Sequence, residues 1–91
     1  MQMLITFDVA DDRRRYRLTQ VLLDYGQRVQ ESVFWVDCDD ELGERIRKRI
    51  SSVISLEEDN VWLAPVCQAC ARKIETYGNT RKPEVPEYFI V

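Results

Sequence analysis

The first residues of the chain alternate between apolar and more polar positions. Met3, Ile5 and Phe7 share one phase of this period of two, and the other phase ends at Asp8. Because successive side chains of a β-strand point to opposite faces, the alternation predicts a half-buried strand. Asp8 is then expected at the C-terminal end of this strand, on its more polar face.

Two later segments show the spacing of helices. After Asp11 and Asp12, which are good N-cap and first-turn residues, apolar residues recur at helical spacing until a predicted stop at Gly26. These apolar residues are Leu18, Val21, Leu22 and Tyr25. A second helix is predicted to begin at Asp39 or Asp40, with basic residues largely on its outer side. Its buried stripe consists of Leu42, Ile46, Ile50 and Val53.

The segment 27–36 is predicted to be a second strand. Val29, Val33 and Trp35 share one of its faces, and the other face, which includes Phe34, is markedly polar. Helices cover only one side of an open antiparallel sheet, so the uncovered side must meet water or another molecule. We place Phe34 and Leu4 on this uncovered side, which is therefore expected to be partly apolar.

The C-terminal half is predicted to add two more strands. One spans 61–66, a short helical turn follows at 67–72, and a last strand lies near 74–77. We assign the elements to the order β-α-β-β-α-β, an α+β ferredoxin-like sandwich. Residues 1–78 are then one ferredoxin-like domain.

The remaining residues, 79–91, are predicted to form a C-terminal extension. Pro83 and Pro86 keep it extended, and it ends in four strand-forming residues. These are Tyr88, Phe89, Ile90 and Val91. A free apolar strand would promote aggregation, so this one is expected to complete a sheet edge in its own chain or, in a dimer, in the partner.

Composition agrees with one folded domain. The 91 residues are 45% hydrophobic and 32% charged, and the start of the chain predicts neither a signal peptide nor a membrane span, so a cytoplasmic location is expected. The net charge of -3 argues against nucleic-acid binding. Basic residues nevertheless cluster at 13–17 and 45–49, so local basic patches remain.

Asp8 is the candidate catalytic and metal-binding residue. The first helix must fold back over the sheet, which brings its first turn near Asp8. Mg²⁺ binds one or two carboxylates together with waters and substrate phosphates, and it can activate water against a phosphodiester. A two-fold dimer that stacks the uncovered sheet faces would double the carboxylates. The alternative is that Asp8 only begins a turn.

Four arginines of the first helix are candidate phosphate ligands. They are Arg13, Arg14, Arg15 and Arg17. The alternative is a solvated face in which they pair with neighbouring aspartates. Arg15 stands out because it lies seven residues before Leu22, on the sheet-facing side of the helix.

The cysteines and tryptophans leave alternatives open. Cys67 and Cys70 have the spacing of half a zinc knuckle or a redox pair, but the chain has no histidine and only Cys38 as a third thiol. One chain therefore cannot complete a four-ligand zinc site, and the alternative is that the cysteines are interior residues, as in a protein from a reducing compartment. Trp35 and Trp62 are expected in the core or in an interface.

Together these features resemble a known family, the small CRISPR-associated endoribonucleases (Cas2) that partner the integrase of the spacer-acquisition complex. The resemblance rests on the apolar strand ending in Asp8, the arginine-rich helix after it, the segment 28–34 and the extended C-terminal tail. It implies a ferredoxin-like homodimer with stacked sheets, in which Asp8 of each subunit is the Mg²⁺ ligand.

The resemblance also implies functional or interface positions in the first helix and the second strand. These are Arg15, Arg17, Arg28 and Phe34. Phe7 stands where the family often has tyrosine, and Trp35 where it often has an acidic residue, so position 35 offers no catalytic carboxylate.

Three functions follow as hypotheses. The first is a homodimeric subunit that bridges integrase dimers and binds duplex DNA, with Mg²⁺-dependent cleavage of RNA or DNA. The second is a purely structural adaptor that uses the same surfaces without catalysis. The third, a regulatory domain that binds a metabolite, is disfavoured because the chain has no glycine-rich phosphate loop.

Overall fold

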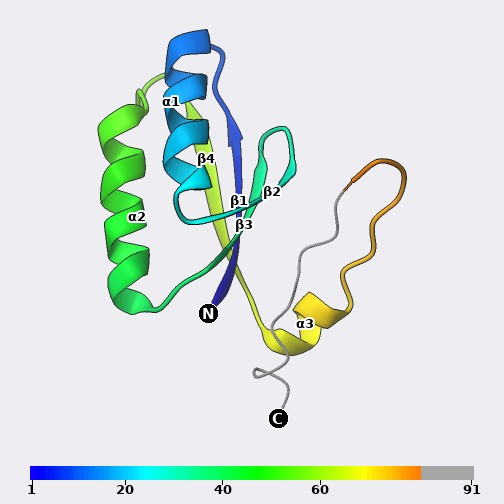
Figure 1. Ribbon diagram of the computed structural model, residues 1–91. Helices are drawn as coiled ribbons and strands as arrows, with labels where there is room; N and C mark the ends of the chain where they lie inside the picture. The colour runs from blue at the N-terminus through cyan, green and yellow to red at the C-terminus, as the bar shows by residue number, and fades with distance from the viewer. Residues whose placement is uncertain (81–91) are drawn as a thin grey trace.

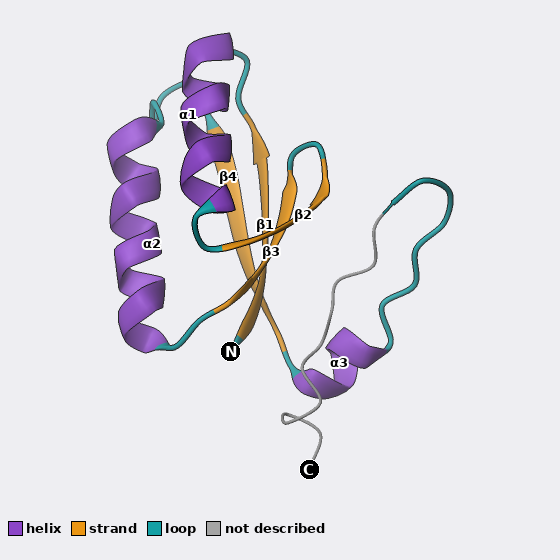
Figure 2. Ribbon diagram, viewed as in Figure 1, coloured by secondary structure: helices purple, strands orange, loops and turns teal. Residues whose placement is uncertain are grey.

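The structure is a computed structural model that describes residues 1–80, so the predicted terminal strand with Tyr88, Phe89 and Ile90 lies outside the described residues. The described elements are β1 (Gln2–Asp8), α1 (Asp12–Leu23), β2 (Gly26–Gln30), β3 (Val33–Asp37), α2 (Asp40–Val53), β4 (Asn60–Val66) and α3 (Gln68–Arg72). The strands form one antiparallel sheet in the order β2-β3-β1-β4. Helices α1 and α2 lie together along one face of the sheet, and α3 follows the end of β4 (Figures 1 and 2). The predicted ferredoxin-like α+β fold is confirmed.

The predicted order of elements, β-α-β-β-α-β, is observed, but two of the segments that we predicted as strands differ from the structure. The segment 27–36 is a hairpin, in which β2 and β3 pair across a turn at Glu31 and Ser32. Alternation alone did not reveal this turn because it contains no Gly, Pro, Asn or Asp, the residues that most often mark a hairpin. Residues 74–77 are not a strand, since Ile74 packs against the face of the sheet instead of pairing with an edge.

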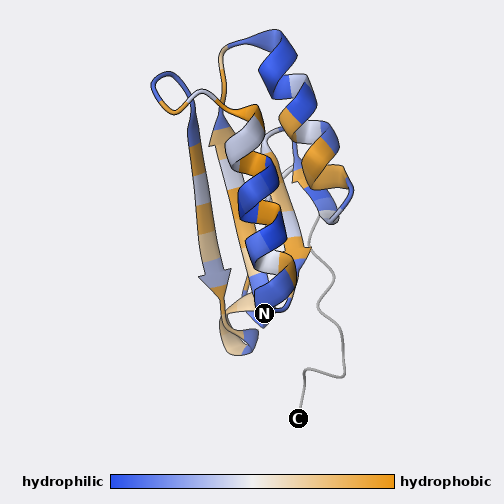
Figure 3. Cartoon of the chain, turned by 90° about the vertical axis from the view of Figure 1, so that its left-hand side faces the viewer, coloured by the Kyte–Doolittle hydropathy of each residue, from blue (hydrophilic) through white to orange (hydrophobic). Residues whose placement is uncertain are grey.

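The main core lies between the sheet and the two long helices. It contains the predicted apolar phase of β1 and the predicted stripes of α1 and α2, whereas the outer side of α2 is largely hydrophilic (Figure 3). Its members include Met3, Ile5, Phe7, Leu18, Leu22, Phe34, Val36, Ile46 and Ile50. A smaller cluster on the opposite face joins Val29 and Trp35 to Ala71 of α3.

Phe34 lies on the opposite face from the one predicted. It pairs with Ile5 in the β1–β3 ladder, its exposed fraction is 0%, and its ring stacks on Phe7 with 6.2 Å between centroids. Side chains directly opposite each other in a ladder share a face, so Phe34 faces the helices together with Ile5. Phe34 is therefore a core residue with no surface to offer a partner chain, which corrects its predicted interface position.

Gly26 is required for close packing of the backbone. A Cβ atom at this position would lie 2.4 Å from the carbonyl oxygen of Trp35, which is shorter than any normal contact. The predicted helix stop is displaced, because α1 ends at Leu23 and Gly26 begins β2 without a positive φ. The residue is glycine because the chain passes directly against β3 there.

A buried ion pair ties α1 to the loop that precedes β4. The Asp59 side chain is 0% exposed, and its Oδ2 accepts hydrogen bonds from Nε of Arg14 and from the backbone N–H of Ser55, each at 2.8 Å. Nη2 of Arg14 also donates to Glu58 at 2.8 Å. Arg14 and the Ser55 N–H hold the pKa of Asp59 below its usual range because both stabilise the charged carboxylate.

The burial of Phe34 predicts a large loss of stability on truncation. We expect Phe34→Ala to lower the free energy of unfolding by about 3–5 kcal/mol, because it removes a buried ring and leaves a cavity. Urea titration measures the loss. Tyr77→Ala is the matched control, since Tyr77 is 83% exposed and its loss is expected to cost less than about 0.5 kcal/mol. A loss for Phe34→Ala that disappears at high protein concentration would instead indicate an interface residue.

The ion pair predicts an acid-dependent difference in stability between the wild type and Asp59→Asn. Because the pKa of Asp59 is lowered in the folded state, its contribution is present above the ordinary carboxyl value of 3.8 and is lost as the pH falls through the folded value. Urea titrations should therefore show the wild type more stable at about pH 7, with the difference shrinking below about pH 4. Asp40→Asn, at an exposed position in the first turn of α2, is the control. A difference that stays constant into acid would contradict the charge-based explanation.

Candidate nucleic-acid and metal site

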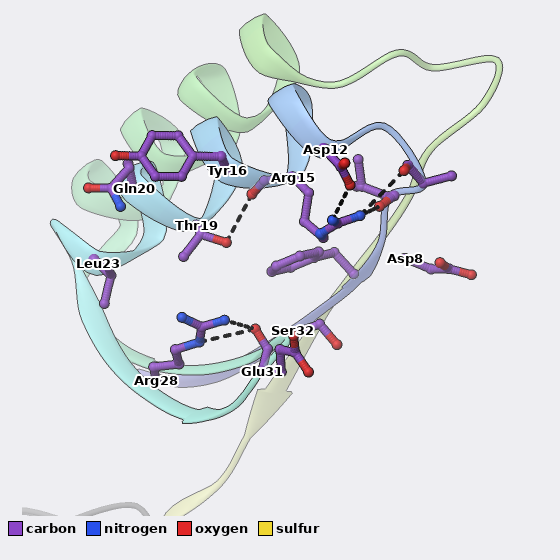
Figure 4. A pocket seen from close by; sticks show the side chains of 13 residues that line it. Asp8, Asp12, Arg15, Tyr16, Thr19, Gln20, Leu23, Arg28, Glu31 and Ser32 are labelled. Atoms are coloured by element: carbon purple, nitrogen blue, oxygen red, sulfur yellow. Dashed lines mark hydrogen bonds and ion pairs between the residues drawn. The ribbon is translucent and has the colours of Figure 1, made fainter.

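An open groove of about 620 Å³ runs between α1 and the β2–β3 hairpin, at the C-terminal end of β1. Its charged lining includes Asp8, Arg15 and Arg28 (Figure 4). The other lining residues are Phe7, Val9, Ala10, Asp12, Tyr16, Thr19, Gln20, Leu23, Glu31 and Ser32. The structure thus brings the predicted carboxylate and two of the predicted arginines to one groove.

Asp8 is exposed because β1 loses a neighbour before it ends. The β1–β3 ladder stops at Thr6, whereas the β1–β4 ladder continues to Asp8, which lies opposite Asn60. Among residues 1–80 the Asp8 carboxylate has no ion-pair partner, and Figure 4 shows it pointing away from Arg15. Asp8 is therefore free to bind a ligand, and the predicted closeness of Asp8 to the arginines holds for the groove but not for direct contact.

Arg15 and Arg28 are fixed on opposite walls of the groove by backbone carbonyl groups. Nη1 of Arg15 donates to the carbonyl oxygens of Val9 at 3.1 Å and Ala10 at 3.3 Å, and Nη2 pairs with Asp12. Nε and Nη2 of Arg28 donate to the Glu31 carbonyl oxygen at 3.1 and 2.7 Å. The guanidinium of Arg28 also lies 5.9 Å from the centroid of the Phe34 ring. Both guanidinium groups retain N–H donors beyond these bonds.

The other three predicted arginines have different surroundings. Arg14 is engaged by Asp59 and Glu58, so its charge stabilises the fold, and its role as a nucleic-acid ligand stays a prediction. Arg13 is exposed. Arg17 is also exposed and lines a second groove, of about 460 Å³, between α1 and α2.

Sequence reasoning did not select Tyr16 and Gln20, which line both grooves. Their spacing of four residues places them on one face of α1, and the helical period was the signal that could have found them. Sequence reasoning also did not select Arg49. This residue lines the second groove and donates hydrogen bonds to Asp24 at 2.9 Å and to the Tyr25 hydroxyl at 3.1 Å. These bonds stabilise the charged guanidinium and raise the pKa of Arg49.

The donor atoms at the groove fit a magnesium ion only in part. Mg²⁺ prefers carboxylate oxygens and waters, and Asp8 supplies one such carboxylate. Asp12 is paired with Arg15, and within residues 1–80 no group of three or more His, Cys, Asp or Glu side chains could hold a metal. Any Mg²⁺ bound by Asp8 of a single chain would therefore take most of its ligands from waters, substrate phosphates or a second molecule.

The cysteines and tryptophans divide between interior and surface. Cys38 is buried, as the interior alternative predicted, but Cys67 and Cys70 are exposed, so that alternative is wrong for them. Trp35 is in the core, whereas Trp62 on the edge strand β4 is 72% exposed.

None of the helices within residues 1–80 is long and apolar enough to cross a membrane.

Comparison with known proteins identifies relatives along most of the chain. The chain is 37% identical over 87 residues to "CRISPR-associated endoribonuclease Cas2 1" of Chloroflexus aurantiacus, which covers 92% of this chain and 91% of the relative. It is 36% identical over 83 residues to "CRISPR-associated endonuclease Cas2 2" of Thermus thermophilus, with 91% and 88% covered.

Solved structures agree with these relatives. A crystal structure of a hypothetical protein from Thermus thermophilus superposes with a TM-score of 0.82 at 34% identity and covers 91% of this chain and 96% of that one. The crystal structure of Streptococcus pyogenes Cas2 gives a TM-score of 0.79 at 29% identity and covers 86% and 100%. The family model "CRISPR associated protein Cas2" matches residues 1–74. The chain therefore belongs to the CRISPR-associated Cas2 family, and its role is CRISPR-associated.

Proposed function

We propose that this protein is a homodimeric subunit of CRISPR spacer acquisition that bridges integrase dimers, binds duplex DNA and cleaves phosphodiester bonds with Mg²⁺ held by Asp8. The observation that carries the catalytic part is the exposed carboxylate of Asp8, which ends β1 at a groove where Arg15 and Arg28 are already fixed. The names of the relatives, endoribonuclease and endonuclease, support the same reaction class.

The face of the sheet opposite α1 and α2, which α3 covers only in part, supports a two-fold dimer. Asp8 falls in the same phase of β1 as Leu4, and the ladder with β4 places Trp62 and Ala64 on that face as well. Part of this face is a largely apolar groove of about 420 Å³, lined by residues that include Leu4, Val29, Val33 and Ile74. Apolar patches of this kind are typical of interaction sites. A two-fold contact repeats every group, so stacking these faces would bring two Asp8 residues toward each other.

The division of work among the residues follows from their positions. The two Asp8 carboxylates would hold the ion on the face where the sheets stack, and the guanidinium groups of Arg15 and Arg28 would bind a phosphate lying in the groove. Mg²⁺, when bound, activates water and neutralises charge on the phosphodiester. Because carbonyl groups already hold both arginines, little side-chain order has to be gained when a phosphate binds.

Duplex binding is assigned to the exposed arginines outside the groove. Arg13 and Arg17 project from α1 and carry positive charge onto a surface of a protein whose net charge is -3. Such charges neutralise backbone phosphates without reading sequence, which suits a subunit that holds DNA of any sequence for an integrase.

The alternative is an adaptor on the same surfaces without catalysis. It is favoured by one observation, namely that the described residues of a single chain assemble no group of three or more His, Cys, Asp or Glu side chains that could hold a metal. Under this alternative Asp8 is dispensable and the arginines are not.

A carboxylate replacement separates the two functions. We expect Asp8→Asn to lower Mg²⁺-dependent cleavage of RNA or DNA on the order of 100-fold, because the amide is a poor Mg²⁺ ligand, while integration assays with the integrase stay at the wild-type level. Asp40→Asn, an exposed aspartate on α2, is the matched control and should retain both activities. Absence of cleavage by the wild type with Mg²⁺ would remove the enzymatic claim and leave the adaptor.

Neutralising the two exposed arginines of α1 tests duplex binding. Each phosphate contact contributes about 0.9 to the slope of log affinity against log salt, so Arg13→Gln with Arg17→Gln should reduce the slope by about 1.8 for each subunit of the dimer that contacts the duplex. Fluorescence anisotropy with labelled duplex at several salt concentrations measures it. The control removes equal charge at Arg72→Gln with Lys73→Gln, at the far end of the molecule near α3. An equal reduction in the control would show an effect of net charge and contradict a site on α1.

A further inference from the structure

Cys67 and Cys70 lie one helical turn apart at the start of α3, and both are exposed. Cys67 is the N-cap residue of this helix, and its Sγ accepts a hydrogen bond from the backbone N–H of Cys70 at 3.3 Å. Residues at this spacing are neighbours on a helix surface. The pair is therefore both mutually close and open to a reagent.

The two thiols differ in acidity in the way a disulfide-exchange pair requires. Hydrogen bonds from Cys70 lower the pKa of Cys67, because they stabilise its thiolate. The same interaction raises the pKa of Cys70, which keeps its proton. Cys38 is a contrast within the same chain, since burial raises its pKa and removes it from solvent. The position of Cys67 at the N-cap, where its Sγ accepts the Cys70 N–H, suits it to act as the attacking thiolate and leaves Cys70 as the resolving thiol.

We propose that Cys67 and Cys70 are a reversible redox site that forms an intramolecular disulfide by exchange with a low-molecular-weight disulfide such as oxidised glutathione. The Cys67 thiolate attacks one sulfur of glutathione disulfide, forming a mixed disulfide and releasing one glutathione thiolate. Cys70 then loses its proton and attacks the Cys67 sulfur, which releases the second glutathione. The protein dithiol is oxidised by two electrons, and the glutathione disulfide is reduced to two thiols.

The disulfide would change the rigidity of α3, which packs on the face of the sheet opposite α1 and α2. Ala71, in the same turn of α3, is buried against Trp35 and Val29, and Ile74 packs on the same cluster. These contacts are apolar, and within the described residues the buried indole N–H of Trp35 has no hydrogen-bond partner. A bond across the first turn would stiffen α3 there. The closed loop is short, so the bond adds little stability and stays easy to reduce.

The test uses the full chain in glutathione buffers of increasing oxidised fraction. Samples are quenched in acid, unfolded in urea so that the buried Cys38 also reacts, alkylated, and analysed by intact mass and peptide mapping. We expect Cys67 and Cys70 to lose alkylation together while Cys38 keeps it, and the change to reverse with reduced glutathione. Cys70→Ser should accumulate a glutathione adduct at Cys67, because the resolving thiol is missing. Cys38→Ser is the matched control and should behave as the wild type.

Three results would overturn the proposal: full alkylation of both thiols in oxidised glutathione, a disulfide between two chains on a non-reducing gel, or protection of the thiols by bound zinc. Hydrogen exchange gives an independent measurement. The amides of Ala71 and Lys73 donate to the carbonyl oxygens of Cys67 at 2.8 Å and Cys70 at 3.0 Å. Their exchange should slow on oxidation of the wild type but not of Cys70→Ser. Unchanged exchange in the oxidised wild type would overturn the stiffening of α3.

Discussion

The position of β1 in the middle of the sheet is the constraint on which the rest of the structure depends. β1 pairs with β3 on one side and β4 on the other, so its apolar phase is held under both long helices. The two ladders end at different residues, and this difference leaves Asp8 paired on one side and open on the other. The same strand therefore builds the core and presents the one carboxylate on which the proposed chemistry depends.

Local signals in the sequence were sufficient for the helices and the first strand. Asp11 and Asp39 were predicted as helix-capping residues, and each accepts a hydrogen bond of 2.8 Å from the backbone N–H three residues on, at Arg14 and Leu42. The hairpin at 27–36 was missed because its turn lacks the usual residues and its strands continue one alternation. In addition, a register irregularity between Arg28 and Gln30 interrupts the regular alternation of side chains between the two faces of the sheet, on which the prediction relied.

The candidate site could be predicted only as far as its residues lie near one another in the chain. Asp8 and Arg15 belong to one strand-to-helix unit, so their common groove followed from topology. The role of Arg14 could not be distinguished from that of Arg15 in the sequence. Its buried partner Asp59 lies 45 residues away, and no local pattern indicates that the two residues pair. Neighbouring arginines in one run thus have different roles, one in stability and the other at the groove.

The close packing at Gly26 has a consequence for how the groove can bind. With no room for a side chain against the Trp35 carbonyl, the short connection from α1 into β2 passes directly against β3 and holds the end of the helix beside the hairpin. The two walls that carry Arg15 and Arg28 are therefore spaced before any ligand arrives. For the proposed phosphate binding, this means that the groove would admit a backbone that fits its existing width and would exclude a broader one.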